Sequence, residues 1–144
     1  MFDAVYLIKD SGILLVSCRS ARLKKQQQQQ HRANARDDLV SAFFTAIDQF
    51  AVSELGEEGI EHVQFKNDKC LYFKDITMNN GSMIKLVVFA SGNKKVDVMN
   101  SINAKAIELK WALVEFIDHY DSSMQISIDM RAKIEDKIIK LFLS

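Results

Sequence analysis

The side chains that could perform acid–base, nucleophilic or metal chemistry are scattered along this sequence. The three histidines are His31, His62 and His119, and His62 has no cysteine or paired carboxylate nearby at ligand spacing. The five glycines form no Gly-x-Ser-x-Gly elbow and no Gly-x-Gly phosphate loop. We therefore expect no catalytic residue, no metal and no cofactor, and we interpret the chain as non-enzymatic.

The two cysteines make neither a ligand cluster nor a disulfide framework. Cys18 and Cys70 lie in apolar runs that are typical of strands, so we expect reduced, partly buried thiols in a cytosolic protein. The carboxylates in "GEEGIE" and "DHYD" are typical of solvated helix ends and turns, and His119 suits a helix end.

Composition indicates one globular domain over residues 1–144. Hydrophobic residues make up 48% of the chain and charged residues 26%, and the formal net charge is zero. No signal peptide is recognisable, and the uncharged apolar runs are shorter than the roughly 20 residues that cross a bilayer. We expect a cytoplasmic protein that reaches membranes, if at all, at their surface or through partners.

Five apolar runs predict the strands that must position any site. "FDAVYLI" and "ILLVSC" flank "KDSG", and because Gly12 can take a positive φ, they predict a hairpin. "GIEHVQFK" alternates with Val63 and Phe65 on one face, and the turn Asn67-Asp68 leads into "KCLYFKDI". The run Leu86 to Ala90 in "IKLVVFAS" predicts a central strand that is covered on both faces.

Three helices are expected. "DDLVSAFFTAIDQFAVSELG" has one apolar stripe that includes Phe43 and Phe50, and an additional stripe through Val40, Phe44 and Ala51. A long helix is predicted from an Asn93 cap to about Tyr120, with its apolar stripe at Met99, Ile102, Ala106, Leu109, Leu113, Phe116, Ile117 and Tyr120. A last helix carries Ile134, Ile138, Leu141 and Phe142, and "MQISIDM" before it suits either a strand or the approach to that helix.

The predicted order is therefore β-β-α-β-β-β-α-α. A five-stranded, mainly antiparallel sheet with helices on both faces is a three-layer α-β-α sandwich of the α/β (α+β) class. No strand-helix repeat with a glycine-rich loop occurs, so a doubly wound nucleotide-binding fold is not expected.

A basic, glutamine-bearing stretch at about 19–36 separates the second strand from the first helix. It has five consecutive glutamines and no acid, and its basic residues are Arg19, Arg22, Lys24, Lys25, Arg32 and Arg36. We interpret it as a mobile insert that can form a transient helix. Residues 37–76 carry nine acidic and three basic side chains, so this arm either stays solvated beside an acidic body or meets anionic lipid or an acidic partner. It contains no aromatic residue, and we expect no nucleic-acid binding.

The hairpin "FDAVYLIKDSGILLVSC", and "DDLVSAFFTAIDQFAVSELG" leading into "IEHVQFKNDKCLYFK", resemble the longin domain. Longins belong to the SNARE-like, profilin-like group that also contains the roadblock proteins, and the likeness extends to small stand-alone archaeal longins. The resemblance covers nearly the whole chain. It implies a scaffold or regulator of a small GTPase or a membrane-trafficking assembly, acting as a homo- or heterodimer with another longin or roadblock protein.

The resemblance also places the partner-binding surface on the first helix and the strand after it. The candidates are Val40, Phe44, Ala51, Val63 and Phe65, although the first three can instead complete a wide core face. A roadblock-like GTPase regulator is the alternative within this class, but the opening hairpin favours a longin. A small-ligand sensor or enzyme of profilin-like fold is the alternative from another class. A closed cavity lined by Tyr72, Phe73 or Trp111, with convergent polar groups, would favour it. Otherwise Trp111 is expected to cover the sheet or anchor the long helix.

Overall fold

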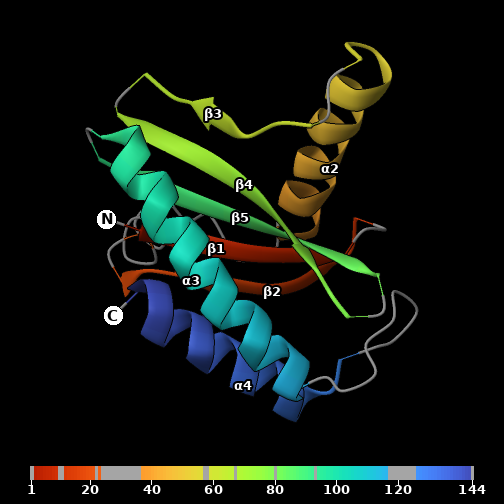
Figure 1. Cartoon of the computed structure of the whole chain (residues 1–144), viewed down its shortest axis with the longest axis vertical. Helices are drawn as coiled ribbons and strands as arrows, with labels where there is room; N and C mark the ends of the chain where they lie inside the picture. Colours follow the sequence, from red (N-terminus) through yellow and green to blue (C-terminus); the bar gives the residue numbers. More distant parts are fainter. Residues whose placement is uncertain are drawn as a thin grey trace.

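The structure is a computed structural model that describes residues 2–9, 12–21, 23, 37–56, 59–66, 68–79, 81–92, 94–116 and 126–143. The elements follow the predicted order (Figure 1). They are β1 (Phe2–Lys9), β2 (Leu14–Arg19), α2 (Asp37–Ser53), β3 (His62–Gln64), β4 (Lys69–Thr77), β5 (Met83–Ser91), α3 (Lys95–Phe116), α4 (Ile128–Ile138) and a π-helical turn, η2 (Ile139–Leu143). The predicted fold class is confirmed.

The five strands form one antiparallel sheet in the order β2-β1-β5-β4-β3. Gly12 in the β1–β2 connection has a φ of 89°, as the hairpin prediction required. β5 lies in the middle of the sheet, and Leu86, Val87 and Val88 are fully buried because helices cover both faces. The predicted central strand is therefore confirmed.

The three helices are divided between the two faces of the sheet. α3 and α4 lie side by side on one face, and α2 lies on the other (Figure 1). The described part of "MQISIDM", residues 126–130, contributes the start of α4: the Ser127 side chain caps that helix by accepting a hydrogen bond from the Met130 N–H at 3.2 Å.

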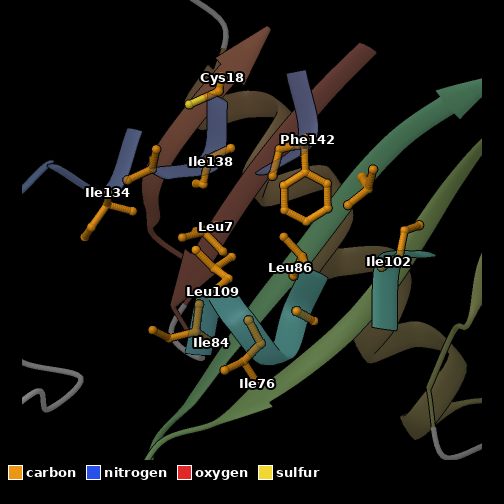
Figure 2. Packing of buried hydrophobic residues seen from close by; sticks show 14 of the residues in the cluster. Leu7, Cys18, Ile76, Ile84, Leu86, Ile102, Leu109, Ile134, Ile138 and Phe142 are labelled. Atoms are coloured by element: carbon orange, nitrogen blue, oxygen red, sulfur yellow. The ribbon is translucent and has the colours of Figure 1, made fainter. Parts of the chain in front are cut away.

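The larger core lies between the sheet and the α3–α4 pair (Figure 2). Alternate β1 residues Val5 and Leu7 point into it, while their neighbours point to the α2 face. The helices contribute side chains at helical spacing, as their stripes predict: Ile102, Ala106, Leu109, Leu113, Ile134, Ile138 and Phe142. This core fixes the sheet on which any site is built.

The smaller core lies under α2 and corrects the interpretation of that helix. Phe44 is buried. The centroid of its ring lies 5.6 Å from that of Tyr6 and 5.9 Å from that of Phe73, and both ring pairs pack edge to face. Phe43 and Phe50, from the other stripe, are exposed. The additional stripe, with Phe44 and Ala51, is thus the one that faces the sheet, because the Phe44 ring fills the space between Tyr6 and Phe73.

Trp111 is a second correction, since 65% of this residue is exposed. The buried positions of α3 include Leu109 and Leu113. Two residues correspond to about 200° of helical rotation, so Trp111, midway between them, points away from the core. It neither covers the sheet nor anchors the helix.

Several predictions concern residues outside the described ranges. These are the Asn93 cap, Asn67 of the predicted turn, the end of the long helical stripe at Ile117 and Tyr120 with His119, and Arg22 and residues 24–36 of the basic arm. In the part of the chain that is described, no helix combines the length and hydrophobicity needed to cross a bilayer.

Both cysteines are buried and neither forms a disulfide, and Cys70 lies near Tyr72 in the larger core. Burial, reinforced by the neighbouring Cys70, raises the pKa of Tyr72 from 10.0 to about 12. Because the folded phenol resists ionisation, this group's contribution to stability is complete below pH 10 and is lost as the pH rises to about 12.

We therefore expect Tyr72 to ionise later than an exposed tyrosine in an absorbance titration at alkaline pH. The Tyr72→Phe variant should lose the ionisation step near pH 12. Loss of a step near pH 10 instead would show that the Tyr72 phenol is accessible to water.

Candidate functional site

The outward side of α2 carries exposed aromatic residues on an acidic helix. Phe43 and Phe50 are 58% and 56% exposed and, seven residues apart, they lie on the same side of the helix. We call these two residues the α2 aromatic face. Val52 and Leu55 are also exposed near the end of the helix. Covering water-exposed phenylalanines with a partner is favourable by about 25 cal/mol per Å² of apolar surface removed from water.

The sequence of α2 and of the segment that follows it is acidic. Between residues 37 and 61 the sequence has seven acidic side chains and no lysine or arginine. The acidic residues are Asp37, Asp38, Asp48, Glu54, Glu57, Glu58 and Glu61. Two copies of α2 packed against each other would bring like charges together, which is costly at an interface.

β3 is the edge strand of the sheet, and two of its neighbouring apolar side chains lie on the sheet face that α2 covers. Val63 is half-buried and belongs to the core under α2, and the exposed Phe65 packs edge to face on Phe89 with centroids 5.9 Å apart. Val63 and Phe65 thus share one face, as the alternation in "GIEHVQFK" predicts.

The predicted partner-binding residues are only partly brought together. Phe44 and Ala51 are buried against the sheet of their own chain, so the exposed positions on α2 are those of the other stripe. Val40 is in α2, but its side chain lies outside the described set. Val63 and Phe65 remain candidates on β3.

The basic arm is described at its start only. Arg19 is the last residue of β2, and its guanidinium carbon lies 5.9 Å from the centroid of the Tyr6 ring. The other predicted arm residues lie outside the described ranges, namely Arg22, Lys24, Lys25, Arg32 and Arg36.

A charged cluster that sequence reasoning missed lies between α2 and the β4–β5 hairpin. The Lys85 ammonium lies 2.6 Å from Asp48 Oδ2 and 3.4 Å from Asp75 Oδ1. Asp48 Oδ1 also accepts the Ile60 backbone N–H at 3.2 Å, which holds the chain before β3 against α2. The one signal in the sequence is that Asp75 and Lys85 become neighbours once the β4–β5 hairpin is paired.

An open cleft of about 490 Å³ adjoins this cluster. It is lined by Asp48, Gly59, Ile60, Glu61, Phe73, Lys74, Asp75, Lys85, Met99 and Asn103. Phe73 is among these lining residues, whereas Tyr72 and Trp111 are not. The cleft is open to solvent, and the small-ligand alternative stays a prediction.

Within the described ranges, no group of three or more His, Cys, Asp or Glu side chains is arranged to hold a metal ion. The expectations of no metal, no cofactor and no catalytic residue remain predictions for the whole chain.

Removing the Asp48 carboxylate should loosen the segment before β3. We expect Asp48→Ala to reduce the free energy of unfolding by about 2 kcal/mol, because the Ile60 N–H and Lys85 each lose a partner. Asp48→Asn keeps an acceptor for Ile60 and should recover part of that loss. Urea denaturation of both variants measures the difference, and equal midpoints for Asp48→Ala and the wild type would contradict this role.

No protein-family model matches this chain, and no curated protein sequence matches it.

Proposed function

We propose that this chain is a non-enzymatic, longin-like protein–protein interaction module. In this proposal it scaffolds or regulates a small GTPase or a membrane-trafficking assembly in the cytoplasm. The binding surface is the α2 aromatic face together with the adjoining strand β3. The partner is a second longin or roadblock protein, a small GTPase, or both.

The observation that carries the proposal is the exposure of Phe43 and Phe50 on a helix without basic residues. Aromatic side chains are enriched among the residues that dominate binding energy at interfaces. The order β-β-α-β-β-β-α-α, with one helix on one face and two on the other, supports the longin-like part of the proposal. The sequence resemblance supplies the class of partner.

The charge of α2 leads us to propose a heteromeric complex. A partner with lysine or arginine around an apolar centre would complement the exposed phenylalanines and the acidic sequence of this helix. Rim charges mainly change the rate of association, so binding should weaken at high salt.

Affinity capture with matched variants tests the proposal. The full chain would be immobilised and exposed to lysate with GDP or a non-hydrolysable GTP analogue. One variant combines Phe43→Glu with Phe50→Glu. Its control combines Ile107→Glu with Trp111→Glu, because these α3 residues are 61% and 65% exposed but lie on the other side of the sheet.

We expect the wild type and the α3 control to retain a small GTPase or a longin or roadblock protein, and the α2 variant to lose it. Retention of that protein by the α2 variant would contradict the proposed surface. Retention of no protein of these classes by the wild type would contradict the proposed function.

A further inference from the structure

Half of the outer edge of β4 has no strand beside it. β4 pairs with β5 along all nine of its residues, but β3 pairs only with Cys70, Leu71 and Tyr72. The Phe65 N–H donates to the Lys69 carbonyl at 2.8 Å, and the Phe73 N–H donates to the Glu61 carbonyl at 2.9 Å. Pairing with β3 thus ends at Phe73.

The alternation of backbone groups shows what the remaining edge offers. Lys69 and Phe73 direct their backbone polar groups toward β3, so Asp75 and Thr77, at the same parity, direct theirs to the same edge. In the described part of the chain no further strand lies there. An extended peptide can pair with such an edge through main-chain hydrogen bonds.

The chain before β3 is held away from this edge by contacts with α2. Asp48 Oδ1 accepts the Ile60 N–H. Gly59 has a φ of 143°, a backbone conformation that residues other than glycine rarely adopt. A Cβ on Gly59 would lie 3.3 Å from Asp48 Oδ1. These contacts attach the chain before β3 to α2, and its pairing with β4 ends at Phe73.

The 490 Å³ cleft wraps around this bare edge, because residues from both faces of the sheet line it. Asp48, Glu61 and Asp75 line it on the α2 side, with Lys85 as the cation between Asp48 and Asp75. Among the described residues, Glu61 forms no ion pair. A basic side chain is therefore favoured on the α2 side.

The α3 side of the cleft has different chemistry. Met99 provides an apolar surface, Lys74 disfavours another cation, and the buried Asn103 Oδ1 has no hydrogen-bond partner in the described part of the chain. Threonine fits this side because its methyl group can contact Met99 and its hydroxyl can donate to Asn103. Side chains of an added strand alternate between the two faces, so both preferences can be met by one segment.

We propose that this cleft binds an extended segment of a partner protein as an additional strand beside Asp75 and Thr77, with basic side chains toward α2 and threonine-like side chains toward α3. The site is separate from the α2 aromatic face and does not depend on the function proposed for that face.

The probe is a fluorescent, end-blocked hexapeptide that alternates arginine and threonine, titrated with the full chain at low salt. Its charge control alternates glutamate and threonine. Thr77→Pro removes the N–H that faces the bare edge but leaves the β5 pairing intact, because that N–H does not point to β5. Thr77→Val keeps the N–H and is the matched control.

We expect the arginine peptide to bind the wild type and Thr77→Val equally, and Thr77→Pro about tenfold more weakly. The glutamate peptide should bind at least about tenfold more weakly than the arginine peptide. Thermal unfolding checks that each variant is folded. If Thr77→Pro does not fold, the Glu61→Gln, Asp75→Asn double variant replaces it with the same expected loss.

The proposal is overturned if the arginine peptide does not bind the wild type, or binds it no more tightly than the glutamate peptide does. It is also overturned if Thr77→Pro, or the Glu61→Gln, Asp75→Asn variant that replaces it, binds the arginine peptide with the affinity of the wild type. The Phe43→Glu, Phe50→Glu variant should bind the peptide as the wild type does. This last result distinguishes failure of the cleft from failure of the α2 surface.

Discussion

Phe44→Asp is expected to leave the chain unfolded at 25 °C. Phe44 is only 5% exposed and packs edge to face on both Tyr6 and Phe73. Losing a buried phenylalanine costs about 3–5 kcal/mol, and a buried carboxylate with no partner adds to that loss. Domains of this size are stable by only about 5–15 kcal/mol, so little stability would remain. Far-UV circular dichroism and urea denaturation measure the outcome.

The neighbouring phenylalanine provides the control. Phe43 is 58% exposed, so Phe43→Asp should change the free energy of unfolding by no more than about 0.5 kcal/mol. If the two variants were equally stable, or if Phe43→Asp were the one that unfolds, the orientation of α2 described above would be wrong.

Ile138→Ala should reduce the free energy of unfolding by about 2–5 kcal/mol. Ile138 is fully buried, and Figure 2 shows it among Cys18 of β2, Ile134 of α4 and Phe142 of η2. Shortening the side chain leaves a cavity between α4 and the sheet that surrounding groups fill only in part. Urea denaturation measures this loss, and an unchanged m value (the slope of the unfolding free energy against urea concentration) would show that only the stability has changed.

Ile139→Ala is the matched control on the next residue, because Ile139 is 42% exposed. We expect a change of about 0.5 kcal/mol or less. Comparable losses at both positions would mean that the last helical segment is not packed on the sheet through Ile138.

The order of strands and helices could be predicted because its signals are local. Gly12 in a short turn, the alternation around Val63 and the continuous apolar run from Leu86 to Ala90 each depend on a few adjacent residues. The burial of Ile102, Leu109 and Ile134 follows from helical periodicity in the same way.

The rotation of α2 could not be predicted, because both of its stripes are apolar and satisfy the same periodicity. The choice depends on the space between Tyr6 and Phe73, which come from distant parts of the chain and meet only in the folded sheet. Trp111 illustrates the related error of expecting a large aromatic residue to be buried when its position on the helix points outward.

The cleft at the β4 edge was also beyond sequence reasoning. Asp48 and Lys85 are 37 residues apart, and nothing in the sequence shows that their side chains pair. The predicted strand at "GIEHVQFK" is present, but β3 has only three residues, and the chain before it contacts Asp48 through the Ile60 N–H. No pattern in adjacent residues indicates that tertiary contact.

Hydrogen exchange of the chain with and without the captured partner tests the central claim most directly. If the α2 aromatic face and β3 form the binding surface, amide exchange should slow in residues 42–55 and 62–66 and stay unchanged in α3. Slower exchange confined to α3 or α4, or no change anywhere in the complex, would contradict the claim that this chain binds its partner through α2.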